Sequence, residues 1–228
     1  MSIIDNIINI KDRIHRTCER VGRRPEDIIL VAVTKTVPVA DIQLAIKHGI
    51  QHIGENRVQE ASDKFNRLGQ CATWHLIGHL QTNKVKKALA IFDLIHSVDS
   101  LHLAQELSRL AQHRSRPLDC LIEVHTSHEA TKYGVAPEET LHLIKEMAKL
   151  PAIRVQGLMT IGPFVPDLEQ VRPSFRLLRE LKDFIQQQGV DGVEMKYLSM
   201  GMTNDFEIAI EEGANMLRIG RAIFGERN

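Results

Sequence analysis

Short apolar runs alternate with amphipathic segments along the whole sequence, and this alternation limits the possible folds more than any other feature. We predict buried strands in the apolar runs at residues 29–35, 52–54, 73–77, 94–98, 118–124, 153–159, 195–198 and 216–219. We predict helices between them, at residues 39–48, 57–68, 81–90, 101–112, 137–150, 169–187 and 204–212. Such alternation implies a parallel sheet covered by helices, and about eight units favour a closed barrel over an open, doubly wound sheet.

A further amphipathic segment precedes the first strand. Ile3, Ile7, Ile10 and Ile14 recur at helical spacing, and Gly22 is expected to end this helix. No GxGxxG motif follows the first strand, which argues against an open dinucleotide-binding sheet. The sequence therefore predicts an α/β protein with one domain over residues 1–228, a single (β/α)8 TIM barrel with an extra N-terminal helix.

Composition narrows the range of partners and cellular environments. The formal net charge is +0, whereas a nucleic-acid partner would call for a basic surface. No apolar run approaches the length of a membrane span, and no signal-peptide pattern opens the chain. Cys18, Cys71 and Cys120 are odd in number and far apart, which is typical of reduced cysteines. We therefore expect a cytoplasmic protein that binds neither nucleic acid nor membrane.

The first predicted strand ends in a lysine. Side chains alternate along a strand, so Ile29, Val31, Val33 and Lys35 share one face. If that face lines the barrel, three branched residues fill the interior and Lys35 lies at the mouth. Partial desolvation there would favour the neutral amine, which can attack an aldehyde and form a Schiff base. The alternative is a solvated lysine at the end of a strand.

The loops after the last two strands are the places where this fold commonly binds phosphate. Residues 199–204 combine the Ser199 hydroxyl, a glycine and a helix start, whose unpaired N–H groups suit an anion, although an ordinary helix N-terminus is the alternative. Gly220 lets the backbone approach a ligand closely in the final loop. Arg218 should point inward, where it needs either a ligand acceptor or a buried carboxylate such as Glu123 or Glu55.

Three other residues are candidates at the barrel mouth. Asn56 follows the second strand, where it could hydrogen-bond a ligand or simply form a turn or cap. His75 lies on the third strand and could line the mouth, and Met159 is expected as a core residue beneath a ligand. We expect no metal site, because the sequence has no HExxH motif and no clustered third ligand.

These segments occur in an order that resembles one known family. In chain order they are AVTKTVP, IGENRVQE, WHLIGHLQTNK, IEVHTSHEATKYG, GLMTIGPF, YLSMGMTNDFEIAI and MLRIGRAIFG. Together they resemble the pyridoxal phosphate homeostasis proteins, the YggS/PROSC-type family, from about residue 28 to about residue 225. The resemblance implies a fold-type III barrel similar to the N-terminal domain of alanine racemase.

The resemblance also implies roles for particular residues. Lys35 matches the lysine that binds pyridoxal 5′-phosphate as an internal aldimine, and Arg218 matches the arginine that faces the pyridine nitrogen. Asn56 matches a residue beside the ring. The phosphate cradle matches Ser199, the backbone around Met200, Gly220 and Arg221. The sequence departs from the common pattern at His125, where asparagine is usual, and at Arg221, where threonine or serine often adds a hydroxyl.

An arginine opposite the ring nitrogen of the cofactor affects which chemistry the cofactor can perform. Catalysis by pyridoxal phosphate usually needs a protonated ring nitrogen as an electron sink, and a guanidinium disfavours that second positive charge. Racemases with this arrangement use an acid/base residue from a second domain, for which the chain leaves no room. We therefore expect a monomer, without catalytic residues, that binds the cofactor, serves vitamin B6 and amino-acid homeostasis, and passes the cofactor to apo-enzymes. The alternatives are a racemase-like enzyme and a barrel aldolase that uses Lys35 with Glu123 and Tyr133.

Overall fold

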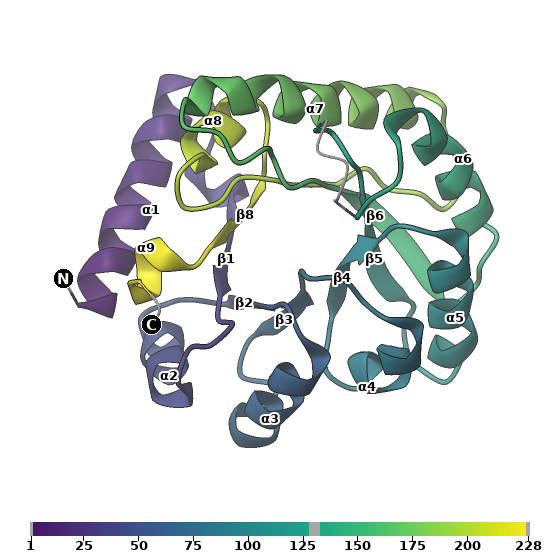
Figure 1. Ribbon diagram of the computed structural model, residues 1–228, viewed down its shortest axis with the longest axis horizontal. Helices are drawn as coiled ribbons and strands as arrows, with labels where there is room; N and C mark the ends of the chain where they lie inside the picture. Colours follow the sequence, from purple (N-terminus) through teal and green to yellow (C-terminus); the bar gives the residue numbers. More distant parts are fainter. Residues whose placement is uncertain (1, 128–132, 227–228) are drawn as a thin grey trace.

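The computed structural model describes residues 2–127 and 133–226. Within them, eight parallel strands close into a barrel in sequence order (Figure 1). β8 pairs with β1, where Val31 lies opposite Arg218, and this pairing completes the ring. The strands are β1 (Ile29–Val33), β2 (His52–Glu55), β3 (Thr73–Leu76), β4 (Leu94–Val98), β5 (Leu118–Glu123), β6 (Ile153–Met159), β7 (Tyr197–Ser199) and β8 (Met216–Ile219). The predicted fold class is confirmed.

Helices surround the strands on the outside of the barrel (Figure 1). They are α1 (Ile3–Arg20), α2 (Val39–Lys47), α3 (Val58–Leu68), α4 (Val85–Leu89), α5 (Leu101–Ala111), α6 (Pro137–Met147), α7 (Arg172–Gln187), α8 (Phe206–Glu211) and α9 (Arg221–Phe224). Short 3-10 turns lie at Pro25–Asp27, Thr82–Lys84 and Leu168–Val171. The short helix α9 was not expected from the sequence, because four residues are too few to show a helical period.

The predicted N-terminal helix is α1, which packs against α2, α8 and α9. It begins with a capping box, in which the Ser2 hydroxyl accepts from the Asp5 backbone N–H and the Asp5 side chain accepts from the Ser2 N–H. It buries Ile7, Ile10 and Ile14, the isoleucines that recur at helical spacing. The helix is thus an integral part of the wall and closes the barrel's outer layer beside α8.

Alternation along the strands separates two apolar cores. Outward residues such as Ala32 and Ile53 pack with the helices in one large cluster. Inward residues form a smaller cluster inside the barrel, made of Val31, Leu94, Leu121, Met159 and Met216. Met159 is fully buried there, as its predicted place in the core requires. The barrel interior therefore has a small apolar core of its own, separate from the one between strands and helices.

Two strand boundaries differ from the prediction. β1 ends at Val33, because Thr34 donates its N–H to Gly54 and then accepts from Val37 in a turn. Lys35 therefore follows the strand and does not belong to it. β7 occupies residues 197–199, further along the chain than predicted, because its pairing with β6 begins where Gly157 lies opposite Tyr197.

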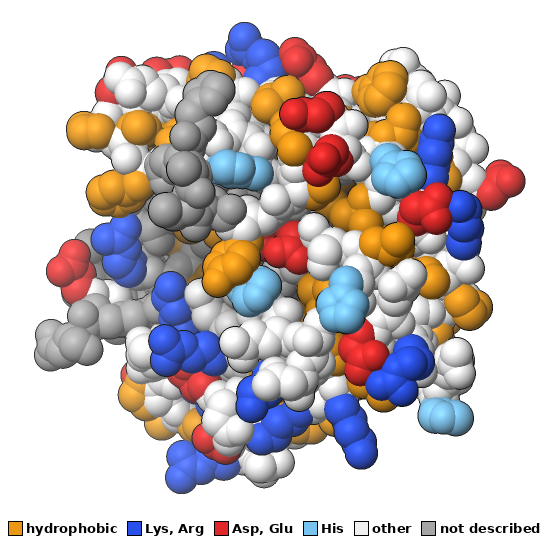
Figure 2. All heavy atoms as spheres, turned by 45° about the vertical axis from the view of Figure 1, so that its right-hand side comes forward, with side chains coloured by type: hydrophobic (Ala, Val, Ile, Leu, Met, Phe, Trp, Pro, Cys, Tyr) orange, Lys and Arg blue, Asp and Glu red, His pale blue; other side chains and the backbone are white. Residues whose placement is uncertain are grey.

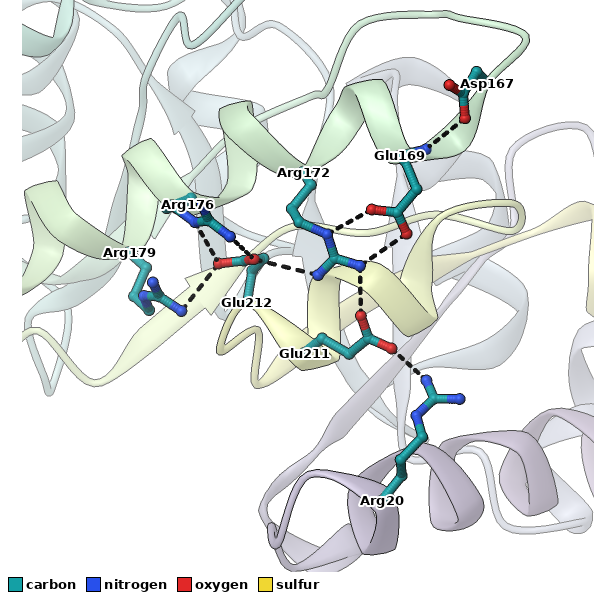
Figure 3. A network of polar contacts seen from close by, with 8 residues as sticks. All are labelled: Arg20, Asp167, Glu169, Arg172, Arg176, Arg179, Glu211 and Glu212. Atoms are coloured by element: carbon teal, nitrogen blue, oxygen red, sulfur yellow. Dashed lines mark hydrogen bonds and ion pairs between the residues drawn. The ribbon is translucent and has the colours of Figure 1, made fainter.

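Charged side chains tie α7 to its neighbours (Figure 3). Glu212, which is 3% exposed, accepts from Arg176 at 3.0 Å and from Arg172 at 3.3 Å. Arg172 also donates to Glu211 at 2.7 Å, and Glu211 pairs with Arg20 of α1. The network links α1 and α7 to the C-terminal end of α8.

Figure 2 shows one face of the molecule, on which basic, acidic and histidine side chains are interspersed with apolar ones. This mixture on the described residues fits the formal net charge of +0. No helix in residues 2–127 and 133–226 is both long and apolar enough to cross a membrane.

Candidate functional site

A cavity of about 530 Å³ lies at the C-terminal ends of the strands. This is the end of the barrel where active sites of the fold occur, and the volume suits a small-molecule ligand. Five residues singled out from the sequence line it, namely Lys35, Asn56, Arg218, Gly220 and Arg221. The structure thus brings together residues from three separate segments of the chain, those after β1 and β2 and the segment 218–221.

The turn that carries Lys35 is held from below by a buried lysine. Lys64, which is 7% exposed, donates to the Thr34 carbonyl at 2.6 Å and to Glu60 at 2.7 Å. Glu60 in turn accepts from the backbone N–H of Thr36, whose φ is 60°. A β-branched residue rarely adopts a positive φ, so these contacts stabilise a strained turn. Lys35 itself is exposed, which differs from the partial desolvation expected from the sequence.

Lys64 also forms an ion pair with a carboxylate at the end of β2. Glu55 is fully buried, and its Oε1 accepts from Lys64 at 2.7 Å and from the Thr34 hydroxyl at 2.6 Å. Its Oε2 has no hydrogen-bond partner among the described residues. Burial raises the pKa of Glu55, against the opposing effect of the bonds from Lys64 and Thr34. The pair therefore holds the end of β2 against the Lys35 turn at a desolvation cost.

Arg218 points into the barrel from β8, as its place between two outward-facing residues predicts. It is 4% exposed, and its guanidinium donates to the Ser199 carbonyl, the Ser199 hydroxyl and the Thr160 carbonyl, each at 2.7 Å. Neither Glu55 nor Glu123 is ion-paired with it in the described part of the chain. Burial lowers the pKa of Arg218 to about 10, so the group stays positively charged at neutral pH.

Glu123 at the end of β5 is a second unusual group near Arg218. Its side chain is almost completely buried, at 7% exposed. Burial raises the pKa of Glu123 to about 7, with Asp99 acting in the same direction and Arg218 opposing both. The carboxyl group is therefore divided between its neutral and ionised forms near physiological pH.

Four sequence candidates do not line the cavity. Met200 and Met159 are fully buried. The Ser199 hydroxyl is also fully buried, where Arg218 and His96 hydrogen-bond to it. His75 lies inside the barrel and does not reach the mouth, because the stagger between strands places the third position of β3 low in the interior.

Several lining residues were missed by the sequence reading. The loop after β6 contributes Ile161, Pro163, Phe164 and Val165. Gly162 allows this loop to approach the 3-10 turn before α7, because a Cβ at this position would lie 2.7 Å from Val171 Cγ1. In the sequence, these lining residues were indicated by the segment GLMTIGPF. That this segment forms an apolar wall of the cavity follows from three-dimensional packing.

Beside further apolar residues such as Val33 and Ile77, the lining includes polar groups that carry mainly positive charge. Lys35, Arg218 and Arg221 are opposed by the carboxylate of Asp205, whose Oδ1 accepts from the Met202 N–H. Thr203 and Asn204 line the same side and have short polar side chains that can donate. An anionic ligand fits this set of groups better than a cation.

The two departures from the family pattern differ in position. Arg221 is exposed and lines the cavity, so its charge is available to an anion. His125 is half-buried outside the lining, and its Nε2 has no hydrogen-bond partner among the described residues. The structure therefore gives Arg221 a place at the site and gives His125 none.

Comparisons with known proteins agree with this geometry. Residues 6–228 match the family model described as alanine racemase, N-terminal domain. The pyridoxal phosphate homeostasis protein of Aquifex aeolicus is 44% identical over 228 residues, which cover 100% of this chain and 99% of that protein. The chain belongs to the family of pyridoxal phosphate homeostasis proteins, whose barrel is the alanine racemase N-terminal fold.

Two solved structures extend the comparison. PipY of Synechococcus elongatus with PLP bound is 33% identical, with a TM-score of 0.86, and the match covers 98% of this chain and 100% of PipY. An alanine racemase from Clostridium difficile has a TM-score of 0.76 at 18% identity, over 98% of this chain and 57% of the racemase. The second likeness concerns the fold alone. The family that the ordered motifs indicated is confirmed.

Proposed function

We propose that this protein binds pyridoxal 5′-phosphate in the cavity above the barrel and serves the cellular balance of this cofactor and of amino acids. The observation that carries the proposal is the set of cationic groups from the turn after β1, from β8 and from α9 around one cavity of about 530 Å³. A primary amine, a buried guanidinium and an exposed guanidinium match an aldehyde, a ring acceptor and a phosphate. The PLP-bound PipY structure supports the same ligand.

Each residue at the cavity has a distinct part in this proposal. Lys35 would hold the aldehyde carbon through Nζ, and Asn56 would lie beside the ring. Gly220 and Arg221 would hold the phosphate with backbone N–H groups and one positive charge, next to Thr203 and Asn204. Ser199 and Met200 would support the phosphate loop from inside, since their side chains are buried beneath it.

We further propose that the protein holds the cofactor without efficient turnover. When bound, pyridoxal phosphate supplies an electron sink that depends on protonation of its ring nitrogen. Arg218 can only donate hydrogen bonds, and its positive charge disfavours a proton on a neighbouring nitrogen. Racemisation of any amino acid in a broad panel, at a rate that Lys35→Ala abolishes, would show instead a racemase-like enzyme.

The remaining parts of the proposal concern the protein in the cell. We propose one functional unit over residues 1–228, a monomer, with apo-enzymes as recipients of the cofactor. The exposure of Lys35 and Arg221 supports transfer, since a partner can approach both. A cytoplasmic location is supported by Cys18, Cys71 and Cys120, all free thiols. The molar mass of the purified protein in solution, measured by light scattering, tests whether it is a monomer.

The test is the visible absorption of the purified protein. We expect a band from bound cofactor in the wild type, and we expect Lys35→Ala to abolish it. Lys47→Ala is the matched control, because Lys47 is exposed on α2 and does not line the cavity. A band that persists in Lys35→Ala, or that is absent from wild type after incubation with pyridoxal phosphate, would contradict the proposal.

A further inference from the structure

A chain of hydrogen bonds crosses the barrel interior and leads to Arg218. His52 Nδ1 lies 3.0 Å from His75 Nε2, and His75 Nδ1 lies 2.9 Å from His96 Nε2. His96 Nδ1 lies 2.9 Å from the Ser199 hydroxyl, which accepts from Arg218 at 2.7 Å. These side chains come from five strands, so the chain depends on the closed barrel.

The chain joins the two ends of the barrel. His52, His75 and His96 lie on the consecutive strands β2, β3 and β4, and the chain then crosses the interior to Ser199 on β7. His75 and His96 are 2% and 0% exposed, and His52 is half-buried. His52 and His75 line a second cavity, of about 600 Å³, at the N-terminal ends of the strands.

The two inner imidazoles are neutral. Burial lowers the pKa of His75 to about 3, and His52 adds to this effect. Burial also lowers the pKa of His96 far below its usual range, with His75 and Arg218 acting in the same direction. At pH 7 a group with the pKa of His75, about 3, is protonated in only about one molecule in 10⁴. This row of hydrogen bonds is therefore poorly suited to carry protons. Its effect on Arg218 must come from the direction in which each hydrogen bond is donated.

Arg218 determines that direction. A guanidinium only donates, so the Ser199 oxygen must accept from it, and the Ser199 O–H must find an acceptor elsewhere. Among the described residues, the acceptor bonded to this hydroxyl is His96 Nδ1. The alternative tautomer of His96 would donate to Ser199 and leave a fully buried O–H without a partner, which is costly. His96 must then donate from Nε2 to His75, and His75 from Nε2 to His52.

We propose that His96, supported by His75 and His52, is a positioning residue that fixes the Ser199 hydroxyl as an acceptor and thereby holds Arg218 in one orientation at the floor of the cavity. All three imidazoles are in the Nε2–H tautomer. This role rests on the proposed function, because Arg218 faces the ring of the bound cofactor in that account.

The direct test is ¹⁵N NMR of the histidines in the ligand-free, full-length protein. Single His→Gln variants assign the signals. We expect His52, His75 and His96 to show the Nε2–H tautomer, and we expect no titration of His75 and His96 between pH 6 and pH 8. An Nδ1–H tautomer at His96, or a titrating His96, would overturn the proposal.

Two substitutions at one position separate positioning from packing. His96→Phe keeps a ring but removes the acceptor for Ser199, whereas His96→Asn keeps an acceptor oxygen near the position of Nδ1. We expect His96→Phe to weaken pyridoxal phosphate binding roughly tenfold and to alter the pH profile of the visible band, because Arg218 loses a fixed acceptor. We expect His96→Asn to keep most of the wild-type affinity for pyridoxal phosphate and most of the wild-type pH profile. His102→Asn is the control, since His102 is exposed on α5.

The outcomes distinguish this proposal from the proposed function. If Lys35→Ala keeps the visible band, the proposed attachment of the cofactor at Lys35 is wrong. The histidine tautomers, which are measured without ligand, still test the row of hydrogen bonds from His52 to Arg218. If His96→Phe and His96→Asn bind equally well with the same pH profile, the histidine chain is only a packing feature and the positioning role is refuted. If His96→Phe does not fold, the wild-type tautomers and His96→Asn decide.

Discussion

The buried ion pair beneath the Lys35 turn gives the sharpest prediction about stability. In Lys64→Met, Glu55 remains fully buried with the Thr34 hydroxyl as its hydrogen-bond donor. The cheapest response is for Glu55 to take up a proton. From the ordinary carboxyl pKa of 4.5 this costs at most about 3 kcal/mol at pH 7, and less because the pKa of Glu55 is already raised in the wild type. The lost bonds to Thr34 and Glu60 add about 1 kcal/mol each, so we expect a loss of about 2–5 kcal/mol.

Urea unfolding followed by the fluorescence of the buried Trp74 measures this loss. Lys47→Met is the matched control, because Lys47 is exposed on α2. The loss in Lys64→Met should shrink toward pH 5, where Glu55 takes up a proton more easily. Glu55→Gln combined with Lys64→Met should recover about 2–3 kcal/mol. The reasoning is refuted if Lys64→Met is as stable as Lys47→Met at pH 7, or if the double variant recovers nothing.

Three further predictions concern buried groups elsewhere. The pKa of Glu123 is raised from 4.5 to about 7, so the folded state binds its proton more tightly and loses stability as pH rises between those values. Glu123→Gln should therefore be more stable than wild type by up to about 3 kcal/mol at pH 8 and about equal at pH 4.5, and equal urea stabilities at both pH values would argue against this. Glu212 has a lowered pKa, because bonds from arginines outweigh the effect of burial, so its stabilisation exists above pH 4.5 and is lost in acid. Glu212→Gln should cost about 1–3 kcal/mol at pH 7 in urea unfolding, whereas the exposed control Glu180→Gln should cost almost nothing, and equal losses would contradict the network's role. In Gly78→Ala the new Cβ would lie 2.5 Å from the Asn56 carbonyl oxygen and 2.8 Å from its Cα, so Asn56 must shift. We expect a stability loss of about 1–3 kcal/mol and weaker cofactor binding by absorbance titration, and unchanged values would show that the close contact is absent.

The sequence predicted the barrel because its signals are local. β-branched runs define the strands, and alternation alone places Arg218 inside, since Leu217 and Ile219 belong to the outer core. Position at a strand end likewise brings Lys35 and Asn56 to the cavity. These features depend on spacing within a few residues.

Features that depend on the stagger between strands were not predictable. The bond between His96 and Ser199 joins residues 103 positions apart, and their heights in the barrel follow from closure. For the same reason His75 was expected at the mouth, although it lies lower in the interior. The partners of Arg218 are carbonyl and hydroxyl oxygens, which no charge pattern in the sequence indicates.

The most direct test of the central claim is to locate the covalent attachment. The protein is incubated with pyridoxal phosphate, reduced with borohydride, digested and analysed by mass spectrometry. The account predicts that the added pyridoxyl phosphate mass lies on the peptide that contains Lys35, and that Lys35→Ala removes it. Label on another lysine in the wild type, with Lys35 unmodified, would contradict the account.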